Sequence, residues 1–164
     1  MSDVHLLQVA YRLSKTLALD DFVQKTTDEL RRSFQVDRVV LYYFYSQWKG
    51  QVTFESLSLK EFSILGSTGP DECFNSEYAA LYLAGRVRAI ADIEKEPIHP
   101  CHRDFLRSLG VRANLVAPIL NKRGLWGLLI AHNCLAPRYW LPFEIETIKR
   151  SGEILAKAAS IRDS

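Results

Sequence analysis

Two apolar segments separated by a short turn constrain the fold of this chain more than any other feature of its sequence. Residues 112–120 and 125–131 are dominated by Leu, Ile, Val and Ala, and Asn-Lys-Arg-Gly lies between them at 121–124. Asn and Gly favour turns, so the pattern predicts a β-hairpin. Residues 125–131 form the longest apolar run, which has the length of a strand and falls far short of the ~20 residues that span a bilayer.

Helical periodicity marks both ends of the chain. Near the N-terminus, apolar residues recur at alternating spacings that match one helix face: they are Leu6, Ala10, Leu13 and Leu17. Asp20 and Asp21 then cap a second helix. The expected face of this second helix comprises Phe22, Val23, Thr26, Leu30 and Phe34. Pro142 is well placed to begin a last helix, with one face formed by Ile145, Ile148, Gly152, Leu155 and Ala159.

The middle of the chain predicts short strands and helices. Residues 38–45 are β-branched and aromatic, Lys49-Gly50 supplies a turn, and in 51–59 Val52 and Phe54 alternate with polar residues, as expected of an antiparallel partner. Further elements are expected as a helix at 75–84, a strand at 88–91 and a helical turn or two at 103–109. Helices at both ends of a set of strands joined mostly as hairpins indicate an α+β domain with helices packed on a sheet.

Composition excludes several classes of function. The 164 residues fit one domain with a real core. A formal net charge of +2 with scattered basic residues gives no electrostatic case for binding nucleic acid or a membrane surface. The cysteines, Cys73, Cys101 and Cys134, are odd in number and form no Cys-x-x-Cys pair, which argues against a disulfide framework. We therefore expect a protein of the reducing cytoplasm.

Four segments carry reactive or polar residues in specific patterns. Asp-Glu-Cys-Phe stands at 71–74, and Arg-Val-Arg-Ala-Ile-Ala-Asp-Ile stands at 86–93. Cys101-His102 is followed by Val-Arg-Ala-Asn-Leu-Val-Ala-Pro-Ile at 111–119, and Leu-Trp-Gly-Leu-Leu-Ile-Ala-His ends at His132. Together these segments resemble the GAF domains of cyanobacteriochromes, which are relatives of phytochromes. The resemblance runs from about Leu6 to the last helix, and Asp-x-Cys-Phe marks the two-cysteine subclass.

The resemblance implies a light-sensing function. It implies a GAF fold, with a mostly antiparallel sheet of five to six strands that has the terminal helices on one face and a bilin pocket on the other. Residues 1–164 would form a single photosensory domain, one module of a larger signalling protein, that binds phycocyanobilin or phycoviolobilin. The domain would switch between a violet- or blue-absorbing state and a longer-wavelength state, green or teal to orange, on Z/E isomerisation at C15. It would be no enzyme beyond attaching, and in some cases isomerising, its own bilin.

The resemblance assigns different roles to two cysteines. Cys101 would form the permanent thioether to ring A. His102 would lie along the tetrapyrrole and bond its pyrrole nitrogens, since neighbouring helix residues diverge by ~100°. Cys73 would add reversibly to the C10 methine bridge, which shortens the conjugated system and shifts absorption to the violet or blue. Cys134 has no assigned role.

Further pocket residues follow from the same resemblance. Asp71 would accept hydrogen bonds from protonated pyrrole nitrogens. Arginine matches a carboxylate bidentately, so the candidates for binding the bilin propionates are Arg86, Arg88 and Arg112. His132 would lie near ring D. The expected aromatic walls of the pocket are Phe74, Tyr78 and Tyr82.

Other functions stay open at this stage. A redox GAF enzyme such as a free-methionine sulfoxide reductase also uses several cysteines, and some GAF modules bind other small ligands. The cyclic-nucleotide pattern Asn-Lys-x-x-x-Phe-x-x-x-Asp-Glu is absent, no motif supports a Cys-His hydrolase, and the Cys and His residues lack zinc-site spacing. Partners would be the bilin and adjacent output domains reached through the terminal helices, with a homodimer as a further option.

Overall fold

The structure is a computed structural model that describes residues 3–69 and 74–164. The helices are α1 (Asp3–Ala18), α2 (Asp21–Phe34), the 3-10 helix η1 (Lys60–Phe62), α3 (Ser76–Leu83), α4 (Pro100–Ser108), α5 (Pro142–Leu155) and α6 (Ala159–Arg162). The strands are β1 (Arg38–Ser46), β2 (Lys49–Leu57), β3 (Arg88–Ile90), β4 (Ala113–Asn121) and β5 (Gly124–Asn133). None of the described helices is long and apolar enough to cross a membrane.

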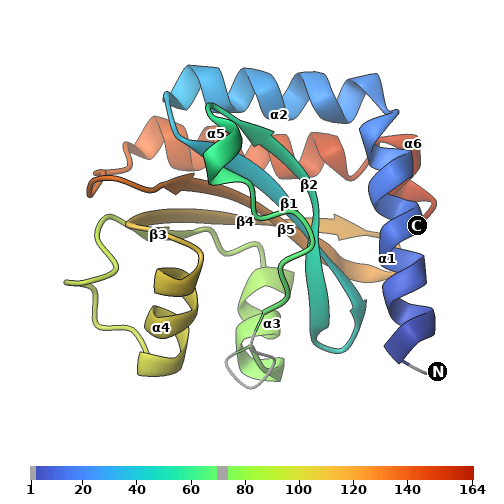
Figure 1. Ribbon diagram of the computed structural model, residues 1–164, viewed down its shortest axis with the longest axis horizontal. Coiled ribbons are helices and arrows are strands. Elements are labelled where there is room, and N and C mark those ends of the chain that lie inside the picture. The colour runs from blue at the N-terminus through green and yellow to red at the C-terminus, as the bar shows by residue number, and fades with distance from the viewer. Residues whose placement is uncertain (1–2, 70–73) are drawn as a thin grey trace.

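In the described part of the chain, five strands form one sheet in the order β2-β1-β5-β4-β3, and every neighbouring pair is antiparallel. Helices α2 and α5 cover one face of this sheet, while α3 and α4 lie against the other (Figure 1). The predicted α+β class, the number of strands and the β4–β5 hairpin are confirmed. The apolar hairpin lies at the middle of the sheet, which is why its sequence is apolar almost throughout.

The two faces of the sheet build two different apolar clusters, because successive side chains of a strand point to opposite faces. On β4, Leu115, Ala117 and Ile119 pack with α2 and α5 in the larger cluster. Val116, between them, belongs to a smaller cluster on the opposite face, which also contains Val40. The helix-covered face is therefore the packed core, and the opposite face is available to hold a site.

A β-bulge overturns the predicted alternation in β2. Leu41 pairs with Phe54, whereas Tyr42 pairs with Val52, so Thr53 is an extra residue on β2. Phe54 consequently packs in the helix-side cluster and Val52 in the cluster on the opposite face, although the sequence pattern placed them together. A bulge depends on the partner strand, and a period-of-two pattern cannot reveal it.

The β1–β2 turn also lies two residues earlier than predicted. The turn is formed by Gln47 and Trp48, and Lys49 already pairs with Ser46. Gly50 therefore belongs to the strand, where a Cβ would lie 2.1 Å from the Tyr43 carbonyl oxygen. Glycine is needed there for a close approach of two strands and not for a turn.

Three helix predictions need correction. In α2 the buried residues are Val23, Thr27, Leu30 and Phe34, whereas Phe22 is exposed. Helix α5 ends at Leu155, so the predicted Ala159 lies on α6 and is exposed. Helix α4 begins at Pro100, earlier than the predicted helical turn, because proline suits the first helical position.

The fully buried Leu129 tests the packed face. Its side chain lies on β5 in the helix-side cluster. Leu129→Ala is expected to lower the free energy of unfolding by about 2–5 kcal/mol, since it leaves a cavity in a close-packed core. Urea denaturation measures the change. Leu135→Ala, at a residue 79% exposed, is the control and should change stability by less than ~0.5 kcal/mol; equal losses in the two variants would contradict this assignment of the core.

Candidate functional site

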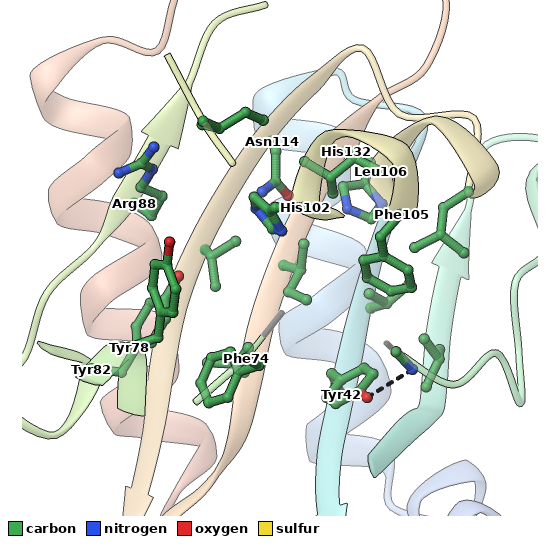
Figure 2. A pocket seen from close by; sticks show the side chains of 18 of the residues that line it. Tyr42, Phe74, Tyr78, Tyr82, Arg88, His102, Phe105, Leu106, Asn114 and His132 are labelled. Carbon is green, nitrogen blue, oxygen red and sulfur yellow. Dashed lines mark hydrogen bonds between the residues drawn. The ribbon is translucent and has the colours of Figure 1, made fainter. Parts of the chain in front are cut away.

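A cavity of about 220 Å³ lies on the sheet face opposite α2 and α5. A water molecule occupies about 30 Å³ of liquid, so the space is that of a ligand rather than of a single bound water. Its floor is formed by side chains of β1, β4 and β5, including Val40, Val116 and Ile130. Residues of α3 and α4 close it from the sides (Figure 2).

Aromatic side chains form one wall of the cavity. Phe74 stacks on Tyr82 with ring centroids 6.0 Å apart and an interplanar angle of 14°. Phe44 lies 5.0 Å from Phe74, and Trp48 lies 5.3 Å from Phe44. The predicted wall residues Phe74, Tyr78 and Tyr82 all line the cavity. Such a wall offers flat faces on which a planar conjugated ligand can stack.

Two of the three candidate arginines lie at this cavity. Arg88, on β3, lines it and forms a 3.9 Å contact with Glu96 that is too long for a hydrogen bond. The Arg86 guanidinium lies over the Tyr82 ring, 5.9 Å from its centroid. Figure 2 shows Arg88 beside Tyr78 and Tyr82. This end of the cavity is therefore basic and suited to bind a carboxylate.

Arg112 lies elsewhere. Its Nε and Nη2 donate to the two carboxylate oxygens of Asp92 at 2.8 and 3.1 Å, and it is missing from the described residues that line the cavity. This bond holds the pKa of Asp92 near 2. The geometry gives the predicted propionate contact of Arg112 no support, because its fork already binds a carboxylate of the protein.

Helix α4 carries Cys101 and His102 on its first turn. His99 caps the helix, since its Nδ1 accepts a hydrogen bond from the Cys101 backbone N–H at 3.0 Å. His102 lines the cavity, and burial, with a smaller effect of Arg88, lowers its pKa to about 4. His102 is therefore neutral at neutral pH and can donate one hydrogen bond and accept another. Cys101 is half-buried beside it, although it is not among the described lining residues. It is disulfide-bonded in this structure, so the expectation that the cysteines form no disulfide is wrong for this residue.

His132, near the end of β5, also lines the cavity and is 2% exposed. Its Nδ1 accepts a hydrogen bond from Arg38 Nε at 2.9 Å. Burial, followed by the positive charge of Arg38, holds the pKa of His132 well below its usual value. Figure 2 shows His132 with His102 and Asn114 in the upper half of the view, above Tyr42 and Phe74. The two imidazoles and the Asn114 amide are thus grouped in one part of the cavity.

Two polar cavity residues were missed by the sequence analysis. Among the described residues, the buried side-chain polar atoms without a hydrogen-bond partner are Trp48 Nε1 and Asn114 Oδ1, and both residues line the cavity. An unpaired buried polar atom costs about 1–3 kcal/mol, so two in one cavity point to a ligand that pairs with them. Asn114 had a signal in the sequence, since it interrupts an apolar strand; Trp48 had none.

Cys73 and Asp71 lie outside the described residues. The described residues on either side, Gly69 and Phe74, both line the cavity. The Gly69 backbone N–H donates to the Tyr42 hydroxyl at 3.0 Å. A Cβ at Gly69 would lie 2.8 Å from that oxygen, so a larger residue here would have to displace the end of the Tyr42 side chain.

Comparison with known proteins gives consistent matches. Residues 18–159 match the model of the GAF domain family. An uncharacterised protein of Picosynechococcus sp. is 51% identical over 163 residues, which cover 99% of this chain and 100% of that protein. A protein of Synechocystis sp. named as a methyl-accepting chemotaxis protein is 38% identical over 141 residues, covering 86% of this chain and 14% of that protein.

Solved structures with the same fold hold bilins or respond to light, by their descriptions. The blue-light absorbing form of the Thermosynechococcus elongatus PixJ GAF domain superposes with a TM-score of 0.73 at 30% identity, covering 94% of this chain and 89% of that one. The phycocyanobilin-bound GAF domain of a cyanobacterial phytochrome gives a TM-score of 0.76 at 28% identity, covering 99% and 96%. The GAF architecture implied by the sequence resemblance is confirmed.

The lowered pKa of His102 predicts an acid sensitivity of the ligand-free protein. Its folded pKa of about 4 lies below the ordinary 6.5, so the unfolded chain binds the proton first. This contribution to stability is complete above the ordinary value and is lost as the pH falls from there towards 4. Urea unfolding should therefore show a smaller acid-induced loss in His102→Gln than in wild type. Identical losses would mean that His102 is not held neutral by burial.

Proposed function

Since the chain belongs to the GAF domain family, we propose that its cavity binds a linear tetrapyrrole and that it is a photoreceptor domain of the cyanobacteriochrome class. The observation that carries the proposal is an aromatic-walled cavity that leaves Trp48 Nε1 and Asn114 Oδ1 unpaired. A bilin is flat and conjugated, with N–H donors, carbonyl acceptors and carboxylates along its edge. Similar GAF structures described with phycocyanobilin or as blue-light absorbing support the same ligand class.

The cavity residues divide the recognition of such a ligand among them. Phe74 and Tyr82 offer stacked aromatic faces to its rings. Arg88, with Arg86 beside it, binds a propionate by charge-assisted hydrogen bonds. His102, being neutral, bonds pyrrole nitrogens. When bound, the tetrapyrrole supplies visible-light absorption and Z/E isomerisation at C15.

Cys101 anchors the chromophore in this proposal. A thiol reductant would first have to open the disulfide in which this structure holds Cys101. The freed S–H would then add across the exocyclic double bond of ring A, so that a C–S bond forms and the proton ends on carbon, with no net oxidation in the addition. Support comes from its place on the first turn of α4, directly before a histidine that lines the cavity. A bond at this turn holds the ligand next to His102. The expected bilins are phycocyanobilin and phycoviolobilin.

Cys73 is the reversible second link, and Asp71 accepts bonds from pyrrole N–H groups. Support for both is the resemblance of residues 71–74, together with the cavity positions of Gly69 and Phe74. A tethered ligand gives a nearby thiol an effective concentration that reaches ~10⁵ M in well-oriented systems. Cys73 can therefore bond C10 in one photostate and release it in the other, which gives a violet or blue form and a longer-wavelength form.

The protein transmits its photostate to a partner and catalyses nothing beyond its own bilin chemistry. We assign residues 1–164 to one sensory domain whose output passes through the terminal helices, to adjacent domains or to a second copy. The chain covers 14% of a relative named as a chemotaxis protein, which supports a role as one module of a larger protein. It covers 100% of the Picosynechococcus relative, so a domain of this kind also occurs as most or all of a protein. Helices α1 and α6 contact one another. A light-induced change in the packing of one terminal helix would therefore also affect the other.

Cys101→Ala is expected to abolish covalent bilin when the protein is produced together with bilin synthesis. The fluorescent band that zinc reveals after denaturing electrophoresis should disappear. Cys134→Ala is the matched control, because Cys134 is a half-buried cysteine outside the described lining of the cavity, and its band should remain. A band that survives in Cys101→Ala would place the linkage elsewhere, and colourless wild-type protein would favour a non-bilin GAF function.

Cys73→Ala separates the two cysteine roles. The variant should keep its covalent bilin through Cys101 but lose the violet or blue dark state, because the conjugated system stays uninterrupted. Absorption spectra of dark-adapted protein measure the change. In wild type, iodoacetamide added during illumination should block the return to the blue state. A blue dark state in Cys73→Ala would contradict the two-cysteine mechanism.

A further inference from the structure

Arg38, the first residue of β1, binds three separate segments from a buried position. It is 2% exposed, and its Nε donates to His132 Nδ1 at 2.9 Å. Its Nη1 donates to the carbonyl oxygen of Phe62 at 2.9 Å, and its Nη2 donates to the carbonyl oxygen of Leu109. One guanidinium thus joins β1 to β5, to η1 and to the C-terminal end of α4.

The sheet register aligns this arginine with the cavity. Arg38 is the cross-strand partner of His132, and His132 is in turn the partner of Asn114 on β4. Partners in antiparallel strands point to the same face, so the three side chains form one row. His132 and Asn114 line the cavity, whereas Arg38 stands behind His132.

The hydrogen bond from Arg38 decides which nitrogen of His132 carries the proton. A guanidinium has donors only, so Nδ1 must offer its lone pair, and the proton of the neutral ring is on Nε2. A second proton on the ring would remove this acceptor and place two cations in contact inside the protein. The imidazole is thereby limited to one protonation state and one tautomer.

We propose that Arg38 is a positioning residue, which holds His132 as its Nε2–H tautomer so that the ring is a hydrogen-bond donor to a carbonyl or carboxylate oxygen of the cavity ligand. The identity of that ligand rests on the proposed function, but the tautomer does not. His132 then cannot accept a bond from a pyrrole N–H, and the opposite task falls to the unpaired Asn114 Oδ1. The two neighbours on the row complement each other, one as donor and one as acceptor.

The shape of the arginine side chain is needed for this arrangement. Its planar fork presents Nε and both terminal nitrogens in fixed directions, and here all three are used. Among the described residues, no carboxylate forms an ion pair with it, so the imidazole and two carbonyl oxygens replace its water. Glu55 and Asp37 are near enough to favour its charge but form no hydrogen bond with it, so its burial is offset mainly by these three acceptors.

The tautomer is measured directly in ligand-free wild-type protein. A long-range ¹H–¹⁵N spectrum of histidine-labelled protein at neutral pH should show an unprotonated Nδ1 and a protonated Nε2 for His132. The signals are assigned by their loss in His132→Gln. A Nδ1–H tautomer, or an average of the two, would overturn the proposal. This result needs no bilin, so it stands or falls separately from the photoreceptor assignment.

Arg38→Lys then tests whether the arginine is the cause. Lysine keeps the charge but lacks the fork, so the His132 signals should change from a single tautomer to an averaged pair. Arg31→Lys is the matched control, because Arg31 Nε donates to Ser56 Oγ at 2.9 Å on α2, away from the cavity. In bilin-loaded protein, Arg38→Lys should shift the absorption maximum while Cys101 attachment is kept. A folded Arg38→Lys variant in which His132 keeps its single tautomer would refute the positioning role of Arg38. If the variant does not fold, the spectrum of the wild-type protein still tests the proposed His132 tautomer.

Discussion

The burial of both faces of the central strands is the constraint on which the rest of this structure depends. Alternate side chains of β4 and β5 belong to different environments: one set packs with α2 and α5, and the other borders the cavity that residues of α3 and α4 also line. Stability therefore resides on one face, and the opposite face can carry an imperfectly packed, polar cavity. The same strands, and even neighbouring residues such as Leu115 and Val116, serve both purposes.

The cavity is incomplete by the usual standards of a protein interior. Buried polar atoms are normally paired, yet Trp48 Nε1 and Asn114 Oδ1 are not, and they lie in the lining of the same space. A native chain can tolerate such unpaired atoms where a bound ligand supplies the missing hydrogen bonds. A ligand that pairs with both atoms would present an acceptor to the indole N–H and a donor to the amide oxygen.

The lining of the cavity combines positively charged arginines with neutral histidine rings. Burial, with a smaller effect of Arg88, lowers the pKa of His102, and burial followed by the charge of Arg38 lowers the pKa of His132. Neutral imidazoles act as directional hydrogen-bonding groups, while the guanidinium of Arg88 remains as a charged anchor at the edge. A ligand with carboxylates at its rim and N–H and C=O groups along its length satisfies both kinds of site.

The sequence by itself determined the order of the elements, the central hairpin and the residues of the motifs, because these depend on local periodicity and composition. Cys101-His102 and Arg88 were identified differently, through the resemblance of their segments to a known family. The tertiary structure alone decided that Arg112 binds Asp92 and that Trp48 reaches the cavity. It also placed Arg38 against His132, a hydrogen bond between residues 94 positions apart. Such pairings depend on which strands meet and in which register, and no local pattern in the chain encodes them.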